Sequence, residues 1–137
     1  MSLGVPFLDT NILIRHLTGD HPAQSPRCRD LIIALETGAQ TAWTSHLVVA
    51  EAVYVLTRVY AFPRPQVADV LLPLIDLPGL KIPRKRLFRR VFALYTTTAL
   101  TFPDCYHAAL VEGSGDRRVI SFDRGFDHLS TVTRLEP

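Results

Sequence analysis

Residues 5–14 read Val5-Pro6-Phe7-Leu8-Asp9-Thr10-Asn11-Ile12-Leu13-Ile14, a short apolar run that ends in an acid and resumes two residues later. The run before Asp9 predicts a buried strand, and the stretch from Asn11 to Leu17 predicts a short helix. A carboxylate between two apolar elements needs an explanation, because removing it from water without a partner costs free energy. Asp9 is therefore a candidate functional residue at the end of the first strand.

Helices and strands are expected to alternate along the rest of the chain. Further helices are expected over 22–37, 45–60, 63–78, 84–96 and 103–112, and further strands over 41–43, 80–82, 119–122 and 131–133. Gly38 is placed to end one helix, and Ser45 is placed to cap the start of the next. Strands that alternate with helices imply a parallel sheet covered by helices on both faces. We therefore expect an α/β fold, with one domain over residues 1–137.

The composition is that of a globular protein. Of its 137 residues, 47% are hydrophobic and 20% charged, and no apolar run approaches the ~20 residues of a membrane span. The chain also begins without a basic leader ahead of an apolar segment. Cys28 and Cys105 are too few for a disulfide framework and suit free thiols in a reducing compartment. We expect a cytoplasmic protein with no membrane partner.

Glu51 lies within the almost wholly apolar stretch 47–56, on an expected helix. Neither a cap nor a turn explains an acid at this position. We therefore expect its carboxylate to be buried beside a partner. The structural alternative to a functional role is an ion pair with a core arginine, Arg15 or Arg58.

Two more acids lie where strands and helices meet. Asp104 is in the first turn of an expected helix, and Asp123 follows the expected strand 119–122. In open parallel sheets, binding sites form beyond the carboxyl ends of the strands, so Asp9, Asp104, Asp123 and Glu51 are expected to converge there. Carboxylates that share a pocket repel one another and suit hard divalent cations.

Three of these acids also have ordinary structural interpretations. Asp9 fits the N-cap of the helix that follows it. Asp104 completes a pattern that resembles a capping box, and an acid in a first turn also favours the helix dipole. Asp123 fits a turn before a glycine. The joint pattern carries more weight than any single acid.

Small polar side chains adjoin the acids and are suited to orienting carboxylates or bound water. They are Thr10, Asn11, Ser45 and Ser121. Four motifs in this order resemble the PIN-domain ribonucleases, and most closely the VapC-type toxins of bacterial and archaeal toxin–antitoxin pairs. The motifs are Leu8-Asp9-Thr10-Asn11, the Ser45 and Glu51 pair, Phe102-Pro103-Asp104, and Ser121-Phe122-Asp123-Arg124-Gly125-Phe126.

The resemblance covers nearly the whole chain and carries expectations about fold and chemistry. It implies a three-layer α/β/α sandwich with a short parallel sheet. It implies that Asp9, Glu51, Asp104 and Asp123 bind Mg²⁺ or Mn²⁺ and hydrolyse phosphodiester bonds of single-stranded RNA. It further implies a cognate antitoxin protein and a homodimer.

Basic residues are the candidate contacts to the RNA backbone. Only Lys81 and Lys85 are lysines among the 15 basic residues, so 13 are arginines, which bind phosphate in a bidentate manner. Six of the ten residues 81–90 are basic, and this run is expected to continue into the helix over 84–96 and to present a basic face to solvent. Arg86 and Arg90 stand four residues apart on that helix, and Arg124 adjoins Asp123. A merely solvated helix face is the alternative for the first two, and an ion pair with Asp127 is the alternative for Arg124.

Two other functions compete with a metal-dependent endoribonuclease. One is a catalytically silent RNA-binding or protein-binding protein on the PIN scaffold, against which the retention of four acids argues. The other is an aspartyl-phosphate phosphatase that uses Asp9 as its nucleophile. That chemistry normally requires a second acid two residues later, where this chain has Asn11.

Overall fold

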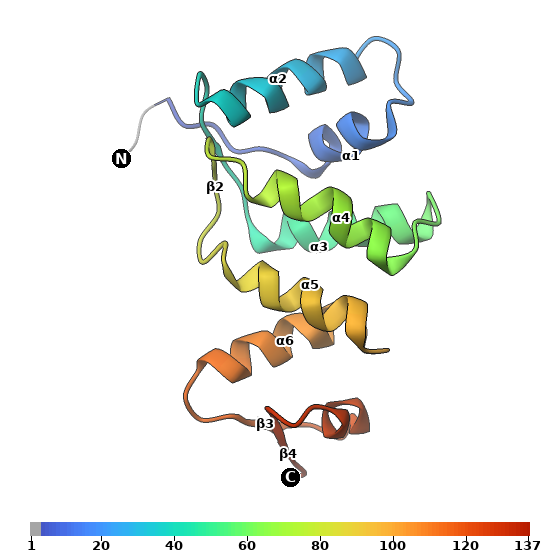
Figure 1. The fold of residues 1–137 in the computed structure, drawn as a ribbon, viewed down its shortest axis with the longest axis vertical. Coiled ribbons are helices and arrows are strands. Elements are labelled where there is room, and N and C mark those ends of the chain that lie inside the picture. Colours follow the sequence, from blue (N-terminus) through green and yellow to red (C-terminus); the bar gives the residue numbers. More distant parts are fainter. Residues whose placement is uncertain (1–3) are drawn as a thin grey trace. The chain divides into compact units, whose positions relative to one another are not determined.

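In the computed structural model, which describes residues 4–137, helix α1 (Thr10–Thr18) begins directly after the apolar run 5–8. Gly19 ends it with a left-handed backbone, at φ 65°. Helix α2 (Ser25–Thr37) ends in the same way at Gly38, as expected. The two helices pack against each other and lie side by side in Figure 1. Leu13 of α1 and Leu35 of α2 are both buried.

Helices α3 (His46–Arg58) and α4 (Arg64–Ile75) complete the helices of the first of two compact units, which ends at Lys85. Ser45 caps α3, because its hydroxyl accepts a hydrogen bond from the backbone N–H of Val48 at 3.2 Å. This confirms the N-cap predicted from the sequence. Helix α3 packs against both α1 and α4.

Strands β1 (Ala42–Trp43) and β2 (Leu80–Lys81) pair in parallel, as expected. The expected strand over residues 5–8 is present as extended chain that forms a single parallel bridge, from Phe7 to Trp43. Its backbone is held on β1, since the N–H of Leu8 donates to the carbonyl of Trp43 at 2.8 Å. This pairing places Asp9 directly beyond the end of the extended segment.

Gly79 shows why a glycine precedes β2. A Cβ atom at this position would lie 2.5 Å from the carbonyl oxygen of Gln40 and 2.6 Å from that of Leu35. Only a residue without a side chain allows these backbones to approach so closely. The approach also serves the strand pair, because the carbonyl of Gly79 accepts from the N–H of Ala42 at 2.9 Å.

The second unit runs from Arg86 to Pro137 and begins with helices α5 (Leu87–Thr97) and α6 (Phe102–Gly113). They lie side by side in Figure 1 and are joined by aromatic side chains. The ring of Phe102 lies 5.4 Å from that of Phe92 and 5.6 Å from that of Tyr95, centroid to centroid. Helix α5 starts later than the expected residue 84, because Arg84 has a positive φ of 50° that an α-helix does not accept.

Strands β3 (Arg118–Ile120) and β4 (Thr133–Leu135) form a second parallel pair. Between them lies the 3₁₀ helix η1 (Arg124–His128), which contacts β4. The last strand begins two residues later than the expected strand 131–133. Along residues 4–137, no helix is long and apolar enough to cross a membrane.

The α/β class with short parallel strands is thus confirmed. The expectation of one domain over residues 1–137, of which residues 1–3 lie outside the described part of the chain, stays a prediction.

Candidate active site

Asp104 lies in the first turn of α6, where the helix begins after the cap residue Thr101. The hydroxyl of Thr101 accepts a hydrogen bond from the backbone N–H of Asp104 at 3.3 Å. The helix cap predicted from the sequence is therefore present, but its hydrogen bond uses the backbone N–H of Asp104. Its carboxylate is partly exposed and remains available for other partners.

Asp123 is held by two local hydrogen bonds at the start of η1. Its backbone N–H donates to the hydroxyl of Ser121 at 2.9 Å, and its Oδ1 accepts from the backbone N–H of Gly125 at 2.8 Å. The turn predicted for Asp123 is thus confirmed. Ser121, expected to support the site, contacts the backbone of the acid rather than its carboxylate. The turn uses only Oδ1 of this exposed carboxylate, so Oδ2 makes no hydrogen bond within the turn.

The carboxylates of Asp104 and Asp123 come together in one pocket of about 570 Å³ within the second unit. The other residues that line it come from the α5–α6 connection and from η1: Thr97, Thr98, Ala99, Leu100, Thr101, Gly125 and His128. Burial, and then the carboxylate of Asp123 beside it, raise the pKa of Asp104 above its usual value. Each of these causes disfavours the ionised form of Asp104. The pocket is therefore a place where negative charge accumulates and where a cation is favoured.

Asp9 occupies the N-cap position of α1, but its side chain makes no capping hydrogen bond. Its carboxylate is exposed, whereas the next residue, Thr10, is 5% exposed. The Thr10 hydroxyl is buried without a hydrogen-bond partner among the described residues. Such an orphaned polar atom is uncommon, since leaving it unsatisfied costs about 1–3 kcal/mol. Asn11 is exposed and lines a separate hollow of about 350 Å³.

Glu51 does not lie where the sequence predicts. Its side chain is exposed on α3, so the expectation of a buried carboxylate is wrong. Two apolar neighbours on the same helix, Leu47 and Tyr54, are also exposed, at 69% and 63%. They stand four residues before and three residues after Glu51 and share its helix face. Across residues 4–85 the structure forms no ion pair between Glu51 and Arg15 or Arg58, which leaves the acid accessible.

The structure thus brings Asp104 and Asp123 together in the second unit and places Asp9 and Glu51 in the first. Among residues 4–137 there is no cluster of three or more His, Cys, Asp or Glu side chains with metal-binding geometry. The convergence of all four acids stays a prediction. Ser45, another expected supporting residue, uses its hydroxyl to cap α3.

The three arginines predicted to bind RNA differ in their engagement. Arg124 is exposed in η1, directly after Asp123, and Arg86 is exposed at the N-terminal end of α5. Arg90 instead makes a bidentate ion pair with Glu112 of α6, at 2.7 and 2.8 Å. An RNA phosphate would have to displace that carboxylate to reach Arg90. Asp127, considered as a partner for Arg124, pairs with Arg134.

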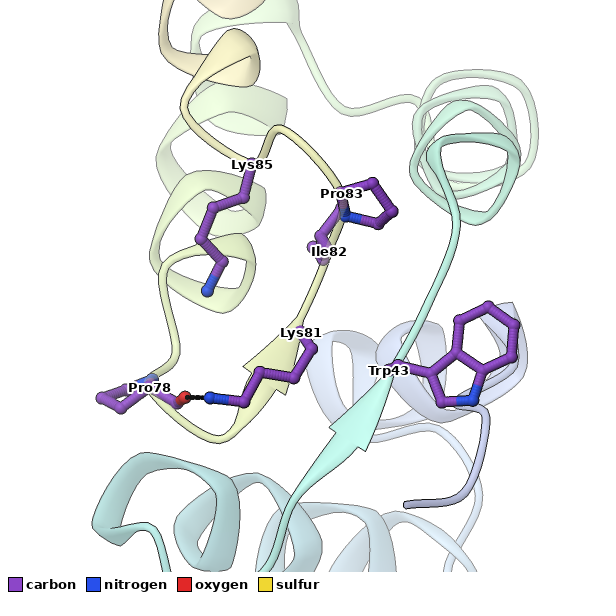
Figure 2. A pocket seen from close by; sticks show the side chains of 6 residues that line it. All are labelled: Trp43, Pro78, Lys81, Ile82, Pro83 and Lys85. Atoms are coloured by element: carbon purple, nitrogen blue, oxygen red, sulfur yellow. Dashed lines mark hydrogen bonds between the residues drawn. The ribbon is translucent and has the colours of Figure 1, made fainter. Parts of the chain in front are cut away.

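The two lysines of the same basic run line a hollow of about 460 Å³ in the first unit, shown in Figure 2 beside Trp43. The ammonium of Lys81 donates to the carbonyl of Pro78 at 3.4 Å. That of Lys85 donates to the backbone carbonyls of Leu77 and Leu80, at 3.1 and 2.8 Å. Both lysines therefore stabilise local backbone, which reduces the basic surface expected from the sequence.

Two residues that sequence analysis missed hold the ends of the acid-bearing segments. Thr44 is fully buried, and its hydroxyl donates to the carbonyl of Leu8, next to Asp9, at 2.7 Å. Arg134 contacts the segment that carries Asp123. Thr44 could have been identified as a polar residue that directly follows the expected strand 41–43. No local pattern identified Arg134, because its partners in that segment, Asp127 and Ser121, lie 7 and 13 residues earlier in the chain.

Comparison with known proteins gives two matches. A family model described as PIN domain matches residues 7–132. Among curated proteins, a VapC ribonuclease of Aquifex aeolicus (strain VF5) is 25% identical over 126 residues, which make up 92% of this chain and 93% of the relative. Both results confirm the resemblance predicted from the four acidic motifs, and the family match spans all four acids.

Proposed function

The chain belongs to the PIN-domain family, and from this premise we propose that it is a metal-dependent endoribonuclease that cuts single-stranded RNA. The similarity to a VapC ribonuclease supports the ribonuclease activity. The observation that carries the proposal is the pair of carboxylates of Asp104 and Asp123 in one open pocket. A second carboxylate that raises the pKa of Asp104 has little structural purpose without a cation.

The residues present fit a hard divalent ion. Carboxylate oxygens are the ligands that Mg²⁺ and Mn²⁺ prefer, and the Asp104–Asp123 pocket supplies them with one oxygen of Asp123 outside its turn. In the first unit, the Asp9 carboxylate makes no capping hydrogen bond, and the hydroxyl of the next residue, Thr10, is buried without a partner among the described residues. These observations support a metal site better than they support a set of structural acids.

We assign each acid a role in this reaction. Asp9 and Asp104 are direct ligands of Mg²⁺ or Mn²⁺, and Asp123 completes the ligand set. Glu51, which is exposed, is a ligand or accepts the proton of the attacking water. The bound ion would supply relief of phosphate charge and a water of lowered pKa. Without it, the acidic pocket repels an RNA phosphate, so the ion serves both binding and chemistry.

Arg124 is the favoured contact to the RNA backbone. It is exposed and directly follows Asp123, which lines the acidic pocket. Arg86 is a second candidate, because it is exposed at the start of α5. Arg90 is the weakest of the three, since its guanidinium already pairs with Glu112. Replacing Arg124 is expected to weaken RNA binding and to reduce its dependence on salt.

We further assign the chain as the toxin of a toxin–antitoxin pair that acts in the cytoplasm, where RNA is available. A basic side chain of the antitoxin would match the acidic pocket electrostatically. A homodimer is also proposed. The exposed Leu47 and Tyr54 of α3, together with the exposed Val59 directly after its end, support a protein partner, because a monomer gains nothing from exposing these large apolar side chains.

The test is cleavage of a labelled single-stranded RNA by the purified chain, with Mg²⁺, with Mn²⁺ and with EDTA. The variants Asp9→Asn and Asp104→Asn are compared with Asp69→Asn, a matched control in which an exposed acid of α4 is changed. We expect cleavage that requires metal, is lost by at least about 100-fold in both site variants, and is retained in the control. Sedimentation of the same samples measures the oligomeric state.

Other outcomes would identify the competing functions. RNA binding without cleavage at any metal concentration would indicate a silent binding protein. A trapped phosphate on Asp9 would indicate a phosphatase. Cleavage that persists in EDTA, or in Asp104→Asn, would overturn the metal-dependent mechanism.

A further inference from the structure

Arg134 of β4 makes a set of contacts that its position near the end of the chain does not predict. Its Nε and Nη2 donate to the two carboxylate oxygens of Asp127, at 2.9 and 3.1 Å. Its Nη1 donates to the backbone carbonyl of Ser121 at 3.1 Å and to Glu136 at 2.8 Å. One guanidinium thus ties β4 to both ends of the segment 121–127, which carries Asp123.

The surroundings of this guanidinium make its contacts strong. The Arg134 side chain is only 12% exposed, whereas its two acidic partners are about half exposed. Asp127, and then Glu136, hold the pKa of Arg134 above its usual range, so it is charged at every physiological pH. A planar fork that meets a carboxylate in a bidentate manner fixes direction as well as distance.

A short path leads from Arg134 to the candidate site. The carbonyl of Ser121 is held by Arg134, and the hydroxyl of the same residue accepts from the N–H of Asp123. On the other side, Asp127 lies in η1, whose first turn contains the Gly125 N–H that donates to Asp123 Oδ1. Arg134 therefore holds the chain on both sides of Asp123 without contacting its carboxylate.

We propose that Arg134 is a positioning residue whose guanidinium fixes segment 121–127 so that the Asp123 carboxylate stays beside Asp104. The effect on metal binding rests on the proposed metal-dependent function, whereas the positioning itself rests on the hydrogen bonds that Arg134 makes to this segment. Partners that orient metal ligands from outside typically change metal affinity or activity 10–100-fold when they are replaced. Loss of Arg134 is therefore expected to lower Mn²⁺ affinity by at least about tenfold.

Arg118 provides a matched control in the same unit. It also makes a bidentate ion pair, with Asp116 at 2.7 and 2.6 Å, but both side chains are 61% exposed. The pair joins residues two apart and does not involve segment 121–127. An exposed pair of this kind contributes little to stability. Arg118→Gln therefore removes the same chemical group without the proposed effect.

The experiment measures two quantities on the full chain: Mn²⁺ affinity by calorimetry, and hydrogen exchange of the Asp123 and Gly125 amides in metal-free protein. The variants are Arg134→Gln, Arg134→Lys, Asp127→Asn and Arg118→Gln, together with Asp123→Asn and the double variant with Arg134→Gln. We expect weaker Mn²⁺ binding and about tenfold faster exchange of both amides in Arg134→Gln, and smaller changes in the Lys and Asp127→Asn variants. Asp127→Asn leaves the guanidinium of Arg134 in place, so it tests the same contact if Arg134→Gln folds poorly.

The double variant separates positioning from general stability. If Arg134 acts through Asp123, replacing it costs no further Mn²⁺ affinity once Asp123 is Asn. A loss that persists in that background, or one that equals the loss in Arg118→Gln, would overturn the proposal. If the wild-type chain binds no Mn²⁺, the proposed function fails. Amide exchange then decides the inference alone, and unchanged exchange in Arg134→Gln would refute it.

Discussion

Replacing Asp123 with Asn tests whether the acidic pair exists for a cation or for the fold. The substitution removes one negative charge from the pocket and changes little else. The side-chain oxygen of Asn keeps the ability to accept the hydrogen bond from the Gly125 N–H, which is 2.8 Å in the wild type. The turn at the start of η1 is therefore retained, so that any change in stability reports the lost charge.

The sign follows from the raised pKa of Asp104. Because its folded pKa lies above the ordinary aspartate value of 3.8, the folded state binds the proton more tightly than the unfolded state. Stability is then lost as pH rises from the unfolded pKa through the folded pKa. Asp123→Asn removes the part of the penalty that comes from Asp123, whereas the part that comes from burial remains. Since Asp123 is exposed, the gain is expected to be roughly 0.2–1 kcal/mol.

The assay is urea denaturation of both proteins in EDTA at pH 7, repeated at about pH 3 and again at pH 7 with saturating Mn²⁺. In EDTA the variant is expected to be the more stable protein at pH 7, and the difference is expected to shrink as pH falls, because a protonated Asp104 no longer repels the charge of Asp123. Adding Mn²⁺ should reverse the order. At 100 times its dissociation constant, a ligand stabilises the native state by about 2.7 kcal/mol, and the variant should gain less.

A less stable variant in EDTA at pH 7 would refute this reasoning. It would show that Asp123 serves the turn and that its charge contributes to the fold. An equal response of both proteins to Mn²⁺ would remove Asp123 from the metal site. RNA cleavage by the same samples should fall in the variant even though its metal-free stability rises.

Three further changes have expected outcomes that a denaturation curve or a cleavage assay can measure. Glu112→Gln weakens the bidentate pair with Arg90 and should cost about 1–3 kcal/mol at pH 7. Because Arg90 holds the pKa of Glu112 below 4.5, this contribution is present above that value and should disappear as pH falls through the folded pKa. Gly125→Ala would place a Cβ 2.7 Å from a side-chain carbon and 3.0 Å from a carboxylate oxygen of the site, so we expect a loss of about 1–3 kcal/mol and weaker Mn²⁺ binding. Thr44→Val keeps the shape but leaves the carbonyl of Leu8 without its 2.7 Å hydrogen bond, at a cost of about 1–3 kcal/mol, and unchanged stability would show that water replaces it.

Local signals predicted the helices well. Ser45 caps α3 and Gly38 ends α2 as expected, since both effects depend on the backbone within one turn of the residue. The start of α5 was predicted three residues too early. The charged run that suggested a helix contains Arg84, whose left-handed backbone precedes the helix. Helix propensity alone does not specify the backbone conformation of the connection between β2 and α5.

Glu51 shows how an apolar sequence context can mislead. A stretch of ten mostly apolar residues suggests burial on every side, yet a helix that packs on one side exposes the opposite face. Glu51, Leu47 and Tyr54 all lie on the exposed part of α3. The pattern predicted the helix, but the packing of α3 against α1 and α4 decided which residues it exposes.

The amino-acid sequence was sufficient to predict the α/β class, most helices with their caps, and the PIN family. These features depend on side-chain chemistry and on spacing within a few residues. The folded structure was needed to show that Asp104 and Asp123 share a pocket, that Arg90 pairs with Glu112, and that Arg134 holds the segment beside the site. These contacts join residues 7 to 22 positions apart. The physical reason is that such contacts depend on how packed elements bring distant side chains together, which no local pattern encodes.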